Sequence, residues 1–276
     1  MCVLSPEHRA GSILQRAQRS GHGKSPTRGR VHAMRLASLA PVATLGWALC
    51  LVFLPAAQSQ AQVFVEDFND NNINPDLWTV DLFGSGPQLV EANQQLQIGF
   101  PRTSSGTAFG GGLVSNFLLR GDFDVQVDYR LLTWPFSNGV RLALAIEEEY
   151  GVERTSFGSQ SDYPHLPREV YLTHFLDGAT GFTATADVTG TLRLVRAGAT
   201  ETGYYCSSGD WVLIHTGPGP TRDVAIQVHA WSHDYAFMDR DVLAAWDNLV
   251  VKSGELVWPG SPSGDTTWGS LKALFR

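Results

Sequence analysis

The stretch GTLRLVRAGATETGYYCSSGDWVLI, residues 190–214, predicts three short strands joined by two turns. Leu192 and Leu194 share one face of the first strand, as expected for side chains that alternate across a sheet. Gly198 and the SSGD sequence at 207–210 supply the two turns. The stretch therefore predicts an antiparallel meander, and the rest of the chain can be interpreted outward from it.

Strand patterns continue on both sides of this meander. The segment DFDVQVDYRL at 122–131 alternates strictly between apolar and polar residues, and residues 140–146 repeat the pattern. Thr103–Gly112 is rich in Ser, Thr and Gly and is interpreted as a crossing between strands. Further strands are predicted at 63–68, 88–92, 94–98, 113–117, 169–175, 181–186, 222–231 and 242–251. The pattern predicts an all-β protein built as a two-sheet antiparallel sandwich.

Two groups of residues carry a family resemblance. Residues 192–211 show the succession Leu-Arg, Arg-x-Gly, Tyr-Tyr and Gly-x-Trp, and residues 67–78 combine an acidic-Phe-Asn-Asp sequence with Asp-x-Trp. These motifs resemble strands of the concanavalin A-like lectin/glucanase superfamily, close to its laminin-G-like branch. The resemblance implies a jelly-roll sandwich and three candidate functions: carbohydrate binding, adhesion to a protein partner, and glycoside hydrolysis.

The N-terminal region predicts export. Residues 1–33 are basic and are interpreted as a mis-called start or a basic extension. Residues 34–61 have the features of a signal peptide, because an apolar run of about 16 residues, too short to span a bilayer, precedes a small-residue site at 59–61. We expect a secreted or cell-surface protein with a jelly-roll domain at 62–254 and a linker and short tail at 255–276.

Net charge limits the kinds of binding partner that we expect, and cysteine content limits the possible disulfides. From residue 62 onward the chain has 13 basic and 26 acidic residues, which gives a net charge of −13. This charge disfavours nucleic acid and anionic lipid as partners. Only Cys206 remains after the predicted cleavage, so no internal disulfide can form, and we expect a buried thiol.

The strand at 222–231 carries the main binding candidates. Gln227, His229 and Trp231 are expected on its solvent-facing side, where an aromatic ring and polar neighbours suit a sugar. The alternative is that Trp231 packs beneath a loop. Other residues expected to join the site are Trp134, Tyr150, Tyr163, His174 and Tyr235. The leading prediction is a secreted, non-catalytic carbohydrate-binding module with a glycan surface as its partner.

Glu147 and Glu149 are the catalytic alternative. On an extended strand they would share one face about 6.5 to 7 Å apart, from a rise of ~3.3 Å per residue. Retaining glycosidases use carboxyl groups about 5 to 5.5 Å apart and inverting enzymes about 6.5 to 9.5 Å, so this spacing is compatible with hydrolysis. The resembling glucanases also place an Asp between their two acids, and this chain has none there.

No cofactor is required by the sequence, although the resemblance implies a structural calcium between the first and last strands. The matching residues are Glu66, Asp67, Asp247 and Asn248, whose oxygen atoms suit calcium. Zinc at His229 and His233 is disfavoured because zinc usually takes three or four ligands and no other His or Cys lies at motif spacing.

Overall fold

The computed structural model describes residues 64–146, 150–158, 165–178 and 180–258, and every regular element in these ranges is a β-strand. The strands are β1 (Phe64–Glu66), β2 (Trp78–Ser85), β3 (Gln88–Glu91), β4 (Leu96–Phe100), β5 (Ser105–Thr133), β6 (Arg141–Ile146), β7 (Tyr150–Ser156), β8 (Glu169–His174), β9 (Thr180–Ala184), β10 (Thr189–Ala197), β11 (Thr200–Cys206), β12 (Val212–Pro218), β13 (Val224–Ser232) and β14 (Val242–Val257). All of the strand pairs are antiparallel.

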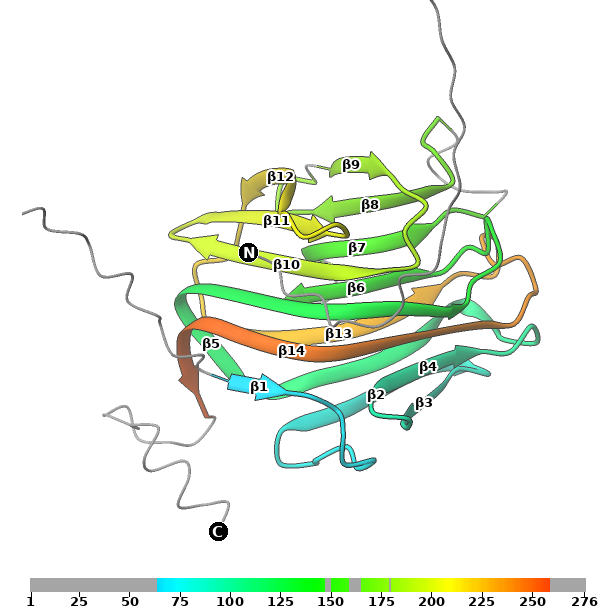
Figure 1. Cartoon of the computed structure of the whole chain (residues 1–276), viewed down its shortest axis with the longest axis horizontal. Coiled ribbons are helices and arrows are strands. Elements are labelled where there is room, and N and C mark those ends of the chain that lie inside the picture. Colours follow the sequence, from blue (N-terminus) through cyan, green and yellow to red (C-terminus); the bar gives the residue numbers. More distant parts are fainter. Residues whose placement is uncertain (1–63, 147–149, 159–164, 179, 259–276) are drawn as a thin grey trace, which may run out of the picture. The chain divides into compact units, whose positions relative to one another are not determined.

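The long strand β5 belongs to both layers of a sandwich (Figure 1). Its first half pairs with β2 and β13, and the layer continues through β6, β7 and β8 to β9. Its second half pairs with β10 and with most of β14, whose last residues, 255–257, pair with 118–120 of β5. This layer extends to β11 and β12 on one side and to β1, β4 and β3 on the other. Gly121, with a φ of 66°, separates the two halves, a backbone conformation that glycine adopts without steric cost. The predicted two-sheet jelly-roll sandwich is confirmed.

The core lies between the two layers. In β13, Val224, Ile226 and Val228 are fully buried and alternate with partly exposed side chains on the opposite face. In β5, the alternation at 123–131 buries the residues that the sequence pattern assigns to the core. Trp246 in β14 is the largest fully buried side chain among the described residues. This packing leaves the other face of the β2–β13–β6–β7–β8 layer, here called the outer face, available for function.

Three features differ from the sequence-based interpretation. The expected crossing at Thr103–Gly112 is wrong, because residues 105–112 form the start of β5. The glycines there allow β2 and β13 to approach closely on either side of β5, and so the run that resembles a loop is strand interior. Strands β2 and β7 were not expected, and β14 continues to Val257, past the boundary expected at 254.

Candidate functional site on the outer face

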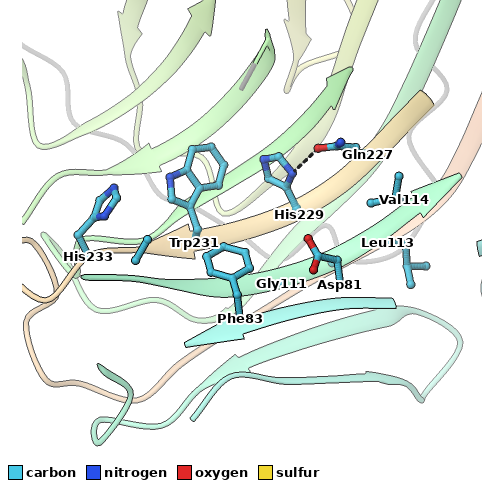
Figure 2. Close-up of a pocket in the computed structure, with 11 residues that line it drawn as sticks. Asp81, Phe83, Gly111, Leu113, Val114, Gln227, His229, Trp231 and His233 are labelled. Carbon is cyan, nitrogen blue, oxygen red and sulfur yellow. Dashed lines mark hydrogen bonds between the residues drawn. The ribbon is translucent and has the colours of Figure 1, made fainter. Parts of the chain in front are cut away.

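A groove of about 280 Å³ lies on the outer face where β2, β5 and β13 run side by side (Figure 2). We call it the β2–β13 groove. It is lined by Asp81, Phe83, Ala108, Gly111, Gly112, Leu113, Val114, Gln227, His229, Trp231 and His233. Strands β2 and β13 lie on either side of β5, so the groove combines side chains that are about 150 residues apart in the sequence.

Glycine backbone forms the floor of the groove. Gly110 and Gly112 of β5 pair with Trp231 and His229 of β13. A Cβ atom added to Gly112 would lie 2.0 Å from the carbonyl oxygen of Val228, and one added to Gly110 would lie 2.3 Å from that of Ala230. Neither position has room for a side chain, so the polar and aromatic residues on β2 and β13 stand on both sides of bare backbone.

Gln227, His229 and Trp231 lie together on the outer face, as the alternation in β13 predicts (Figure 2). The Nδ1 atom of His229 is 3.1 Å from the Oε1 atom of Gln227, and the His229 and Trp231 rings meet edge to face at 4.6 Å. Burial lowers the pKa of His229 to about 4, so its imidazole is neutral at pH 7. Because Oε1 only accepts hydrogen bonds, Nδ1 carries the proton and Nε2 is left as an acceptor.

Trp231 is only 8% exposed, and its ring contacts are with residues of β13 and β6 rather than with the loop that the alternative interpretation expects. It nevertheless lines the groove, with His229 on one side and the guanidinium carbon of Arg141 5.6 Å from its ring centroid. Trp231 therefore positions the polar residues beside it and offers a limited apolar surface to a ligand.

Sequence reasoning missed Asp81 and Phe83, which form the opposite wall of the groove. Both lie on β2, where only Trp78 is buried, so the strand lacks the alternation that reveals a half-buried strand. Phe83 is 38% exposed. Asp81 pairs in register with Gly112, which pairs with His229, so the three residues form one row of cross-strand partners. At ~4.8 Å per strand, Asp81 and His229 are about 10 Å apart across the floor.

The other predicted ligand-binding residues are more distant. Trp134 donates its indole N–H to Glu169 and packs against the core, outside the groove. His174 is on β8, three strands from Gln227 in the same row. Tyr235 is 42% exposed and stacks on His233 at 5.2 Å, which places it at the end of the groove. Tyr163 and the side chain of Tyr150 lie outside the described residues.

Glu147 and Glu149 also lie outside the described residues. The strands on either side are described, and Ile146 of β6 pairs with Tyr150 of β7. The preceding pair, Ala145 with Gly151, is in the same row as Gln227. The described residue before the two glutamates is therefore one strand from β13, and the residue after them is two strands from it.

Within the described part of the outer face, two carboxylates share the row of His229. Asp81 is on β2, and Glu153 is a buried residue on β7 that accepts a hydrogen bond from Thr155. Four strand intervals separate them, about 19 Å. That distance is too large for a pair of glycosidase carboxyl groups.

The residues predicted to bind calcium are partly engaged elsewhere. Glu66 accepts hydrogen bonds from the Phe68 backbone and the Trp78 indole. Asp247 pairs in register with Asp128, and burial together with the negative charges of Asp128 and Asp67 raises the pKa of Asp247 to about 6. Asn248 donates to Asp128 rather than offering its oxygen there. In the ranges that the structure describes, no group of three or more His, Cys, Asp or Glu residues is placed to hold a metal ion.

Two further expectations can be compared with the structure. Cys206 is buried in β11, as expected. Among the described residues, no helix is long and apolar enough to cross a membrane. The predicted signal peptide at 34–61 lies outside the described residues and stays a prediction.

Solved structures with a similar fold include several glycan-cleaving proteins. A β-1,3-glucanase from Mycobacterium marinum is 13% identical with a TM-score of 0.49, and covers 70% of this chain and 100% of its own. A glycosyl hydrolase family protein from Mycobacterium fortuitum is 12% identical with a TM-score of 0.48, and covers 69% and 99%. A third structure has the description "Prominent members of the human gut microbiota express endo-acting O-glycanases to initiate mucin breakdown". It is 12% identical with a TM-score of 0.50, and the match covers 69% of this chain and 99% of that chain.

These comparisons correct the leading prediction of a non-catalytic carbohydrate-binding module. The similar structures carry the names of glycan-cleaving proteins, and none of the three is named as a non-catalytic binding module. At 12% identity and a TM-score of 0.50, the likeness to the third structure shows a shared fold and nothing further.

Two comparisons at the level of sequence bear on the family of this protein. A search of curated proteins finds no match. A family model does match residues 52–257, which is most of the chain and includes every strand of both layers. The protein therefore belongs to the family described as "Protein of unknown function (DUF1583) C domain".

Proposed function

We propose that this protein is a glycoside hydrolase that binds a glycan chain in the β2–β13 groove. The observation that carries the proposal is the groove itself, in which a glycine floor lies between the Phe83 and Trp231 walls with Asp81, Gln227 and His229 along it. An aromatic ring can pack on the C–H face of a sugar while polar side chains bind its hydroxyl groups. The names of the similar structures support the same reaction class.

We assign the two catalytic carboxyl groups to Glu147 and Glu149. Glycosidases require one carboxylic acid to protonate the leaving oxygen and one carboxylate to act as nucleophile or base. The described carboxylates Asp81 and Glu153 are too distant from each other to share that task. Glu147 and Glu149 are the acids that the sequence offers for this task, and the residues that flank the connection, Ile146 and Tyr150, are on the two strands that follow β13 in the sheet.

His229 and Gln227 are assigned to substrate binding. The neutral His229 ring donates from Nδ1 to Gln227, so its Nε2 atom can accept a hydrogen bond from a sugar hydroxyl. The Gln227 amide nitrogen can donate to a second hydroxyl. Both side chains are held by the register of β13, which limits the conformational entropy lost on binding.

Turnover of glycans tests this proposal. The purified protein would be incubated with a panel of β-1,3-glucan, mucin O-glycans and acidic polysaccharides, and new reducing ends would be measured. We expect Glu147→Gln and Glu149→Gln each to lower kcat by about 100-fold or more, because each removes a carboxyl group from the reaction. Glu148→Gln is the matched control, since it removes the same charge between them, and should retain activity.

Binding is measured separately from turnover. Trp231→Phe should raise KM severalfold with a smaller effect on kcat, because it reduces the ring surface beside the sugar and keeps the fold packed. Release of no reducing ends from any glycan of the panel would contradict the proposal. Equal activity in the Glu147→Gln, Glu148→Gln and Glu149→Gln variants would contradict the assignment of the acids.

We further propose that the protein belongs to the concanavalin A-like superfamily and is exported through the signal peptide at 34–61. The motif succession at 192–211 and the two-layer fold support the first, and the apolar run before residues 59–61 supports the second. N-terminal sequencing of the protein from culture supernatant should begin at Gln62. A mature protein that retains residues 34–61 would contradict cleavage.

A further inference from the structure

Arg141 is a cation on the outer face without a carboxylate partner in the described residues. It is the first residue of β6 and pairs in register with Trp231 of β13 and Thr155 of β7. Three other described arginines form ion pairs: Arg120 with Asp223, Arg193 with Asp124, and Arg154 with Glu169. The ion pairs of the described residues do not include Arg141.

Two aromatic rings hold the guanidinium of Arg141 in place. Its Cζ atom is 5.6 Å from the centroid of Trp231 and 6.0 Å from that of Phe157. Contacts with ring faces stabilise the cation and leave its N–H groups unused, because a ring face accepts no strong hydrogen bond from them. Those N–H groups form a planar fork that matches two oxygen atoms of a carboxylate or sulfate group.

Arg141 also lies next to the β2–β13 groove. It lines a small hollow of about 10 Å³ together with Tyr235 and His233, and His233 also lines the groove. Arg141 is the cross-strand neighbour of Trp231 on β6, so a sugar that extends from the groove over the Trp231 side chain comes to lie beside Arg141. In a chain with a net charge of −13 from residue 62 onward, an unpaired cation at this point attracts an anionic group that the rest of the protein repels.

We propose that the groove takes an acidic glycan and that Arg141 binds the carboxylate or sulfate group of one of its sugars. This inference rests on the proposed function, since it names the substrate class for the same groove. A neutral glucan would leave the N–H groups of Arg141 without an anionic partner, whereas an anionic sugar would form charge-assisted hydrogen bonds there. Arg141 thereby becomes a residue that determines specificity.

The test compares the affinity of the full-length protein for a neutral glucan, a polyglucuronate and a sulfated glucan of similar length. We expect the protein to bind at least one of the anionic polymers about 10-fold or more tightly than the neutral glucan, from the strength of charge-assisted hydrogen bonds. A preference for polyglucuronate that is lost after reduction of its carboxyl groups identifies a carboxylate ligand. A preference for the sulfated glucan alone identifies a sulfate ligand.

Two variants show whether Arg141 is responsible. Arg141→Gln should abolish the preference for the anionic polymer, and Arg141→Lys should retain part of it because the charge remains. Arg120→Gln removes the same charge from an exposed ion pair and should retain the full preference. If Arg141→Gln unfolds the protein, the comparison of Arg141→Lys with Arg120→Gln still separates a local effect from a change in net charge.

The outcomes distinguish this inference from the proposed function. Cleavage of neutral glucans without any preference for anionic polymers would overturn the inference and leave the hydrolase proposal standing. Arg141-dependent binding of an anionic polymer that is never cleaved would support the inference and overturn the hydrolase proposal. An equal preference for anionic polymers in wild type and Arg141→Gln would overturn the role of Arg141.

Discussion

At the scale of single residues, the groove contains a histidine whose charge state depends on its packing. His229 remains partly open to the groove, and burial lowers its pKa to about 4, against about 6.5 for an unperturbed histidine. Between these two pH values the unfolded chain binds a proton at this side chain that the folded protein does not. The free energy of unfolding therefore falls as the pH falls from about 6.5 to about 4.

This linkage can be measured with His229→Gln, which keeps a polar side chain and removes the titration. We expect the Tm of the wild type to fall more steeply than that of the variant between pH 7 and pH 4.5. Above pH 7 the two curves should run parallel, because His229 is neutral in both the folded and the unfolded chain there. Parallel curves across the whole range would show that packing does not perturb His229.

Asp247 has the opposite linkage. Its pKa is raised to about 6, above the value of 3.8 in an unperturbed chain, because burial and the charges of Asp128 and Asp67 oppose ionisation. The folded protein therefore binds the extra proton between pH 3.8 and 6, and the contribution of Asp247 to stability is lost as the pH rises through that range. Asp247→Asn should raise the Tm at pH 7.5 in the presence of a chelator and have a smaller effect at pH 4.5.

The same variant tests the predicted structural calcium. A bound cation would neutralise the repulsion between Asp247, Asp128 and Asp67, so calcium would raise the Tm of the wild type and have little effect on Asp247→Asn. A Tm that calcium leaves unchanged in both proteins would contradict a structural calcium site at Asp247. The pH effect of the preceding prediction would be unaffected by that result.

Residue positions were predictable where the alternation of a strand reveals its two faces. Gln227, His229 and Trp231 share the outer face of β13 because the residues between them are apolar and buried. Asp81 and Phe83 could not be identified in this way, since β2 is mostly exposed on both faces. Arg141 could not be identified from the sequence either, because its proposed role depends on contacts with the rings of Trp231 and Phe157, which are on other strands or loops.

At the scale of the elements, the glycines of β5 determine the depth of the groove. Gly112→Ala would place a Cβ atom 2.0 Å from the Val228 carbonyl oxygen, so β5 and β13 would have to move apart. We expect a loss of about 1 to 3 kcal/mol in the free energy of unfolding, as for other overpacked sites, and weaker glycan binding.

The control for this prediction is Gly99→Ala in β4. An added Cβ atom there would meet only the Leu243 side chain at 3.7 Å, an ordinary contact distance. Chemical denaturation of both variants should show a clear loss for Gly112→Ala and little change for Gly99→Ala. Equal stabilities would mean that β5 and β13 adjust without cost, and that the floor does not depend on glycine.

The glycine run also shows why one element was misinterpreted from the sequence. Glycine usually interrupts a strand, and so residues 103–112 resembled a connection between strands. Here the absence of side chains serves close packing between neighbouring strands, which only the three-dimensional arrangement of β2, β5 and β13 reveals. In contrast, the meander at 190–214 was predictable because its turns and its alternation agree.

At the scale of the whole molecule, β5 joins the two layers into one cooperative structure. Its first half pairs with β2 and β13 and its second half with β10 and β14, so neither layer can lose β5 without disturbing the other. We expect the described domain to unfold in a single transition in urea, with coincident curves from circular dichroism and tryptophan fluorescence. Two separated transitions would show that the layers are independent folding units.

Strand β2 gives the groove a further property. Within the described residues it pairs with β5 alone, so the wall that carries Asp81 and Phe83 is also the margin of its sheet. The opposite wall, on β13, is paired with β5 on one side and β6 on the other and is fixed. The β2 wall of the groove can therefore be displaced at the cost of one strand pairing, whereas a displacement of the β13 wall would break two.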